Sequence, residues 1–210
     1  MRTRVISLGF DATPAIALVS RLGTAGDDGY LFIGYGGPSS SVRAKPARQA
    51  ILEFFSGLAA HGVDVKVDFV EAVGNPDLDV PELALRLADA GVVEFYVLGG
   101  MRYHAVLLYV VSQVLPGESA FYVTNEATMD LVRFPVQKMR DLREGRVDVL
   151  RALLEGPTTE RRLALLSDRS QSRVSRILKE LVAAGLVEGP DPHKYRLTGL
   201  GRAYLALRGR

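Results

Sequence analysis

Two short glycine-containing segments carry residue types that suit phosphate binding. The first is SLGFDAT at residues 7–13, and the second is VLGGMR at residues 97–102. Glycine lets backbone N–H groups approach phosphate oxygens closely, and an arginine adds charge and parallel donors. The alternative interpretation is that Gly99 and Gly100 only make a tight turn, with Arg102 at the surface.

Both segments follow expected strands in a chain where strand-like and helix-like stretches alternate. The strands are expected at 4–10, 29–37, 63–72, 93–100 and 118–125, and the helices at 13–23, 45–62, 76–91 and 102–115. This alternation predicts parallel βαβ units in a Rossmann-like, doubly wound, mainly parallel α/β sheet. Residues 129–136 are expected to add an edge strand.

The carboxyl ends of parallel strands share one edge of the sheet, where ligands bind near the topological switch point. The segments after the second and fifth strands therefore join the two glycine segments in one predicted ligand-binding set. It consists of Gly9, Phe10, Asp11, Ala12, Thr13, Gly34, Tyr35, Gly36, Gly37, Pro38, Ser39, Gly99, Gly100, Met101, Arg102, Thr124 and Asn125. A nicotinamide cofactor is not expected, because the first turn, GFDATP, holds a single glycine instead of G-x-G-x-x-G.

Catalysis is not expected from these residues. The chain has no cysteine, which excludes thiolate nucleophiles and thiolate metal sites. His104 lies two residues after Arg102, but a lone histidine at a helix start is more often structural. Since no nucleophile, base and orienting group can be assembled, and no metal cluster either, we predict a non-enzyme without cofactor or metal.

Charge divides the chain into two modules. Residues 1–136 carry ten Lys and Arg against fifteen Asp and Glu, a balance of −5, whereas residues 137–210 carry sixteen against nine, a balance of +7. We predict a ligand-sensing domain at 1–136, a linker at 137–145 and a second domain at 146–210. The basic domain favours a polyanion as partner. No apolar run approaches the length of a membrane span and the start of the chain lacks signal-peptide features, so a cytoplasmic location without a membrane partner is expected.

The basic domain contains an amphipathic helix that begins after Ser170. Its apolar stripe is Val174, Ile177, Leu178, Leu181 and Val182, at helical spacing. Polar and cationic side chains lie off this stripe, where arginine and glutamine suit base edges in a DNA major groove. The predicted DNA-binding set adds cations of a following hairpin and consists of Arg169, Ser170, Gln171, Ser172, Arg173, Arg176, Lys179, His193, Lys194 and Arg196.

Helix, turn, helix and a two-stranded hairpin over 146–208 resemble the winged helix-turn-helix family. With SLGFDAT and VLGGMR in a preceding Rossmann-like domain, the chain resembles CRISPR-associated CARF-domain transcription regulators of the archaeal Csa type. The resemblance implies a homodimer built through the CARF domains, which binds a cyclic oligoadenylate, most often cyclic tetra-adenylate, across its dyad. It also implies promoter DNA of CRISPR–Cas genes as the second partner.

Three alternatives stay open at this point. Some CARF domains cleave their own cyclic ligand, so a ring nuclease is one. A winged-helix regulator that senses another small ligand is the second, and a winged helix that docks proteins is the third. Activation, repression and ligand-assisted DNA binding are all compatible with these residues.

Overall fold

The computed structural model describes the whole chain except residues 1, 26–27, 37–39, 64, 126–127, 129, 140–141, 143, 190–192 and 209–210, with backbone alone at 40–43. The chain divides into two compact units. Unit 1 is Met1–Asn75 with Leu87–Lys138, and unit 2 is Pro76–Arg86 with Met139–Arg210. The division differs from the one expected from charge in one helix, because residues 76–86 cluster with the basic part of the chain.

Unit 1 is built on a six-stranded, mostly parallel sheet with the order β3-β2-β1-β4-β5-β6. The parallel strands are β1 (Arg2–Ser7), β2 (Asp28–Tyr35), β3 (Lys66–Ala72), β4 (Val92–Val97) and β5 (Glu118–Thr124). The edge strand β6 (Leu131–Phe134) is antiparallel to β5. The prediction of an α/β fold with a mainly parallel sheet is therefore confirmed, and the order is the Rossmann-like one.

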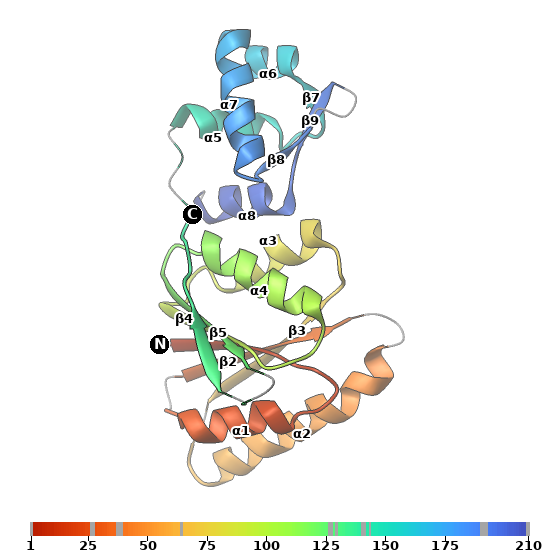
Figure 1. Ribbon diagram of the computed structural model, residues 1–210, viewed down its shortest axis with the longest axis vertical. Coiled ribbons are helices and arrows are strands. Elements are labelled where there is room, and N and C mark those ends of the chain that lie inside the picture. Colours follow the sequence, from red (N-terminus) through yellow and green to blue (C-terminus); the bar gives the residue numbers. More distant parts are fainter. Residues whose placement is uncertain are drawn as a thin grey trace. The chain divides into compact units, whose positions relative to one another are not determined.

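Helices flank both faces of this sheet (Figure 1). On one face, α1 (Thr13–Leu22) and α2 (Ser40–Ala60) bury a cluster that includes Ile6, Phe32 and Tyr96. On the other, α4 (Arg102–Val114) brings Tyr109 edge-on to Phe121, with ring centroids 5.2 Å apart. The prediction for α2 was wrong at its start, because the helix begins at Ser40 and takes Pro46 into its interior instead of its first turn.

The topological switch point of the sheet lies between β1 and β4. The connection from β1 runs through α1 on one face, whereas the connection from β4 runs through α4 on the opposite face (Figure 1). Since β1 and β4 are neighbours in the sheet, the connections that follow their carboxyl ends diverge and leave a crevice. The segments SLGFDAT and VLGGMR follow these two strands.

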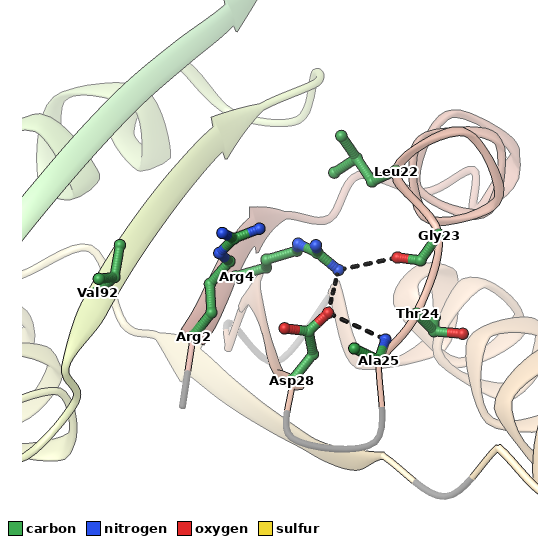
Figure 2. A pocket seen from close by; sticks show the side chains of 8 residues that line it. All are labelled: Arg2, Arg4, Leu22, Gly23, Thr24, Ala25, Asp28 and Val92. Carbon is green, nitrogen blue, oxygen red and sulfur yellow. Dashed lines mark hydrogen bonds and ion pairs between the residues drawn. The ribbon is translucent and has the colours of Figure 1, made fainter.

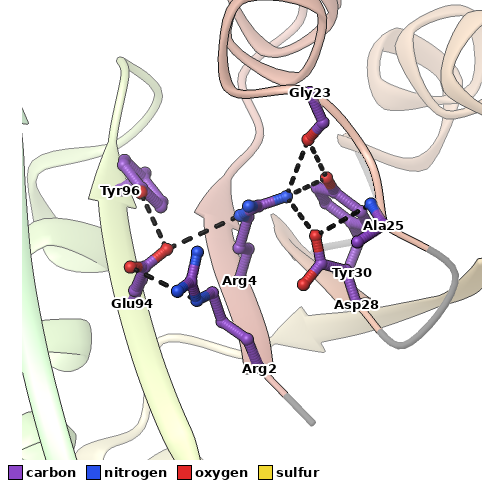
Figure 3. Close-up of polar contacts among 8 residues, drawn as sticks. All are labelled: Arg2, Arg4, Gly23, Ala25, Asp28, Tyr30, Glu94 and Tyr96. Atoms are coloured by element: carbon purple, nitrogen blue, oxygen red, sulfur yellow. Dashed lines mark hydrogen bonds and ion pairs between the residues drawn. The ribbon is translucent and has the colours of Figure 1, made fainter.

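At the amino ends of the same strands, a buried arginine holds the sheet together (Figure 3). Arg4 is 4% exposed, and its Nη1 lies 2.8 Å from Asp28 Oδ2 on β2 and donates to the Gly23 carbonyl after α1 at 3.0 Å. Its Nε lies 3.5 Å from Glu94 Oε2 on β4, and the Tyr30 hydroxyl is a further partner. Burial raises the pKa of Tyr96, whose hydroxyl donates to Glu94 at 3.0 Å. This network ties β1, β2, β4 and the end of α1 to one cation.

Unit 2 joins helices to a three-stranded sheet with the order β7-β9-β8. Its elements are α3 (Pro76–Arg86), α5 (Glu144–Ala152), β7 (Thr158–Thr159), α6 (Glu160–Leu166), α7 (Gln171–Ala183), β8 (Val187–Glu188), β9 (Lys194–Leu197) and α8 (Gly199–Arg208). Thr159 caps α6, because its side chain accepts from Arg162 N. The predicted stripe of α7 is buried except at Val182, which is 37% exposed; that part of the prediction was wrong.

The segment predicted as a linker at 137–145 is held at both ends. Lys138 Nζ donates to the carbonyls of Ser112 and Leu115 at 2.9 and 3.0 Å and to Ser119 Oγ at 2.6 Å, and it thereby satisfies the end of α4. Burial lowers the pKa of Lys138 to about 8. Beyond it, Leu142 N donates to the Tyr204 hydroxyl at 2.8 Å within unit 2.

We expect Arg4→Met to lower the free energy of unfolding by about 3 kcal/mol, because Asp28 and Glu94 then lose the cation that compensates their burial. Urea unfolding with linear extrapolation measures the change. The matched control is Arg2→Met. Its side chain is 50% exposed and lies 3.7 Å from Glu94, so a loss below about 0.5 kcal/mol is expected. Equal losses in the two variants would contradict the assignment.

Candidate functional site

The two glycine segments meet at the crevice between β1 and β4. A methyl group added at Gly9 would lie 3.4 Å from the Gly100 nitrogen, so the two backbones are in close contact. Ser7 links the strand ends, since its hydroxyl accepts from Leu98 N at 3.1 Å and donates to the Gly99 carbonyl at 2.9 Å. The turn needs glycine because φ is +89° at Gly100 and +153° at Gly99.

Two cavities open at this carboxyl edge of the sheet. The one we call the turn cavity has a volume of about 260 Å³ and is lined by Leu8, Gly9, Phe10, Tyr35, Ala44, Gly100, Met101 and His104. The α2 cavity beside it measures about 110 Å³ and is lined by Leu8, Gly34, Tyr35, Ala44, Lys45, Arg48, Phe69, Val70 and Glu71. The two cavities are neighbours, because both linings include Leu8, Tyr35 and Ala44.

Part of the predicted ligand set lines these cavities. The residues brought together are Gly9, Phe10, Gly34, Tyr35, Gly100 and Met101. Asp11 and Thr13 instead shape the start of α1, where Asp11 Oδ1 accepts from Thr13 N at 2.8 Å and the pKa of Asp11 is lowered by that bond. Ala12 precedes α1 and is buried.

Other members of the predicted set lie outside the two linings. They are Gly36, Gly99, Arg102 and the β5 pair Thr124 and Asn125. The strand order explains the β5 pair, because β4 separates β5 from the crevice. Gly37, Pro38 and Ser39 lie outside the described residues.

The cations that line the α2 cavity come from a place the sequence interpretation did not consider. Arg102 begins α4 and is exposed, whereas Lys45 and Arg48 of α2 reach the α2 cavity. The Arg48 guanidinium lies over the Phe69 ring, 4.6 Å from its centroid, and 3.7 Å from Glu71 Oε1. Lys45 and Arg48 are three residues apart on a helix, so they lie on one face. This spacing could have been read from the sequence.

The lining of the turn cavity also includes a histidine, His104. It lies in the first turn of α4 and is 1% exposed. The crevice therefore combines backbone groups of two glycine turns, an aromatic ring and a buried imidazole, with two cations beside them. Such an edge suits an anionic ligand with a flat apolar part.

A larger cavity of about 580 Å³ opens at the opposite, amino edge of the sheet (Figure 2). Its lining includes Arg2, Arg4 and Asp28. The dashed contacts in Figure 2 show that Arg4 already binds Asp28 and the Gly23 carbonyl. The buried Arg4 is compensated by carboxylates and serves the fold. The lining also contains the half-exposed Arg2, so the balance of two cations and one carboxylate is the same as in the α2 cavity. Open α/β sheets bind ligands beyond the carboxyl ends of their strands, near the topological switch point, so we favour the carboxyl-edge cavities as the candidate ligand site.

Two further kinds of feature are absent from the part of the chain that the structure describes. There, no group of three or more His, Asp or Glu side chains is placed to hold a metal ion. Nor does any described helix combine the length and apolar composition needed to cross a bilayer.

In unit 2, the start of α7 presents polar side chains to solvent. Ser170, Gln171, Ser172, Arg173, Arg176 and Lys179 are all exposed. The opposite side of the helix is anchored, since Val174, Leu178 and Leu181 are fully buried. The outward face is thus held in place by an apolar core.

The remaining residues of the predicted DNA-binding set differ in how free they are. Arg169 is partly buried, its Nη2 is 2.8 Å from Asp148 Oδ2, and its guanidinium packs on Gly145. This favours a structural role that fixes α5 to the turn before α7. Arg196 pairs with Glu188 at 2.6 Å across the β8–β9 hairpin, while His193 and Lys194 are exposed, His193 with φ of +67°.

One comparison with known proteins finds a similarity in this basic region. A family model described as "HVO_A0261 N-terminal domain" matches residues 140–207, about a third of the chain. No curated protein matches the chain. The matched segment covers α5 to α8 and none of the sheet elements of unit 1.

We expect Gly100→Ala to destabilise the protein by about 1–2 kcal/mol, because alanine is strained at a φ of +89°. The added methyl group would also lie 3.4 Å from the Leu8 carbonyl and 3.5 Å from His104 Nδ1. Gly34→Ala is the matched control. A methyl group there meets nothing within 4 Å, so near-neutral stability is expected. Urea unfolding of both variants checks this, and a neutral Gly100→Ala would argue against the tight turn.

Proposed function

We propose that the protein is a ligand-responsive, DNA-binding transcription regulator. In this proposal, unit 2 contains a winged helix-turn-helix in which α7 enters the major groove and the β8–β9 hairpin contacts phosphates. Unit 1 acts as a CARF-like sensor that binds a cyclic oligoadenylate, cyclic tetra-adenylate first among them, in a homodimer. Promoter DNA of CRISPR–Cas genes is the proposed target, and no catalytic role is proposed for the protein.

The observation that carries the DNA part is the two-sided character of α7. Three of its apolar side chains are fully buried, while Gln171, Arg173 and Arg176 are exposed near its start. Arginine and glutamine offer paired donors and acceptors to guanine and adenine edges. Residues 137–210 carry a net charge of +7, which favours approach to a polyanion. Binding of a protein partner by the same face is the competing function.

Support for the ligand part comes from the crevice at the switch point. Gly9 and Gly100 approach closely there, and Tyr35 offers a ring on which a base could stack. Residues 1–136 carry a net charge of −5, and Lys45 and Arg48 provide positive charge beside the crevice. Local cations are what an anionic ligand requires against that background.

A dimer through unit 1 has support in exposed apolar side chains around the crevice. Phe10 is 57% exposed, Met101 is 42% exposed, and Val106 on α4 is 62% exposed. A cyclic tetranucleotide with two-fold symmetry fits a site on a two-fold axis, to which each subunit contributes one crevice. A cavity of about 260 Å³ then represents half of the site.

The DNA part is tested by Arg173→Ala and Arg176→Ala. Each should weaken binding to the protein's own promoter fragment roughly tenfold or more, because each removes a contact to a base edge or phosphate. Gel-shift titrations at two salt concentrations measure this, and loss of a phosphate contact lowers the salt slope by about 1. Arg21→Ala, an exposed arginine on α1, is the matched control and should bind as wild type. Full binding by the α7 variants would contradict the assignment.

The ligand part is tested by calorimetry with cyclic tetra-adenylate. Lys45→Ala and Arg102→Ala should each weaken binding roughly tenfold, because each removes a charge-assisted contact to phosphate. DNA affinity without ligand should stay near that of wild type. Lys66→Ala, an exposed lysine at the amino end of β3, is the control. Recovery of linear product from labelled ligand would instead identify a ring nuclease, with His104 as the first residue to replace. Binding of no cyclic oligoadenylate would favour another small ligand.

A further inference from the structure

Helix α3 belongs to one unit by chain order and to the other by its contacts. Chain order places it between β3 and β4 of the sheet, yet it packs against α8 and clusters with unit 2. Its residues Val80, Leu83 and Ala84 are buried. In chain order α3 therefore interrupts unit 1, and both of its ends are covalently linked to that unit. Its contacts, however, are with unit 2.

The contact with α8 is a close approach of two backbones. Gly199 N donates to Asp77 Oδ1 at 2.5 Å, so a side chain of α3 satisfies the first turn of α8. A methyl group at Gly199 would lie 2.7 Å from the Asp77 Cα and would also collide with the Pro76 carbonyl. Only glycine permits this seating.

From Gly199 a short chain of hydrogen bonds leads to α7. The neighbouring Thr198 caps α8, because its Oγ1 accepts from Gly201 N at 3.1 Å, and the same hydroxyl donates to the Gly185 carbonyl at 2.7 Å. Thr198 N also donates to the Leu186 carbonyl at 3.2 Å. Gly185 and Leu186 directly follow the end of α7. The first turn of α3 is thus three bonded steps from the proposed recognition helix.

The other end of the same connection lies at the candidate ligand site. Tyr35, which lines both carboxyl-edge cavities, lies beside Gly74, where an added methyl group would be 3.6 Å from the tyrosine ring. Gly36 N donates to the Ala72 carbonyl at 2.9 Å. Only Asn75 separates Gly74 from α3.

We propose that α3 couples the ligand site to the DNA-binding helix. A ligand that packs on Tyr35 shifts segment 72–75, the first turn of α3 moves against Gly199, and the seating of α7 changes through Thr198 and Gly185. This inference rests on the proposed function for the identity of its two ligands. A coupling of this kind changes affinity typically 5- to 150-fold.

The experiment measures the DNA affinity of the full-length protein with and without cyclic tetra-adenylate. Wild type should show a change of at least about fivefold. In Gly199→Ala and in Asp77→Ala, DNA and cyclic tetra-adenylate should each still bind. The ligand-induced change in DNA affinity should fall below about twofold, because the contact between α3 and α8 that carries the coupling is altered. Asp77→Ala adds no bulk, so it tests the contact even where Gly199→Ala folds poorly. The control is Gly57→Ala, a glycine of α2 with open space around it, which should keep the full change.

A second arm needs no ligand. Tyr35→Ala should raise amide exchange across α8 by at least about fivefold, and this effect should vanish in the Asp77→Ala background. An unaltered ligand effect in both contact variants would overturn the inference and leave the proposed function standing. If wild type binds no cyclic oligoadenylate, the proposed ligand is wrong and the exchange arm decides alone. Unchanged exchange in α8 would then overturn the inference as well.

Discussion

Strand β1 is paired on both sides with parallel strands, and the connections that follow it and its neighbour β4 leave on opposite faces of the sheet. Everything at the carboxyl edge depends on this divergence. It separates the ends of α1 and α4, and it brings Gly9 against Gly100 where the two turns begin. A helix on the same face after both strands would fill this space with side chains. The crevice is thus a consequence of topology, and the glycines are the residues that permit its two turns.

The two edges of the sheet differ in how deeply their cations are buried. At the amino edge, Arg4 is buried together with Asp28 and Glu94, so its charge is compensated and serves cohesion among three strands. At the carboxyl edge, Lys45 and Arg48 lie on a helix face next to the aromatic rings of Tyr35 and Phe69. A buried cation held between carboxylates stabilises the fold, whereas an exposed cation beside a cavity, such as Lys45, can contact a ligand. The larger cavity lies at the amino edge, whereas the candidate ligand site lies at the carboxyl edge, where the connections diverge.

In unit 2, α7 is held in place by an apolar core and by ion pairs. The core under α7 includes residues of α5, α6, α8 and β9, so the face that the helix turns outward is fixed. Two ion pairs, Arg146 with Glu180 and Arg169 with Asp148, add constraints between α5 and the region of α7. Helix α8 is seated against α3, which belongs to the same unit although chain order places it between β3 and β4.

The sequence by itself determined the alternation of elements, the mainly parallel sheet, the two glycine turns and most of the apolar stripe of α7. These features depend on local periodicity and on backbone conformations that few residue types adopt. Only the tertiary structure decided the strand order, and with it that Thr124 and Asn125 lie away from the crevice while Lys45 and Arg48 lie beside it. The same holds for the ion pair of Arg169 with Asp148, the exposure of Val182 and the packing of α3 in unit 2. Each of these depends on contacts between residues far apart in the chain, which neither spacing nor composition encodes.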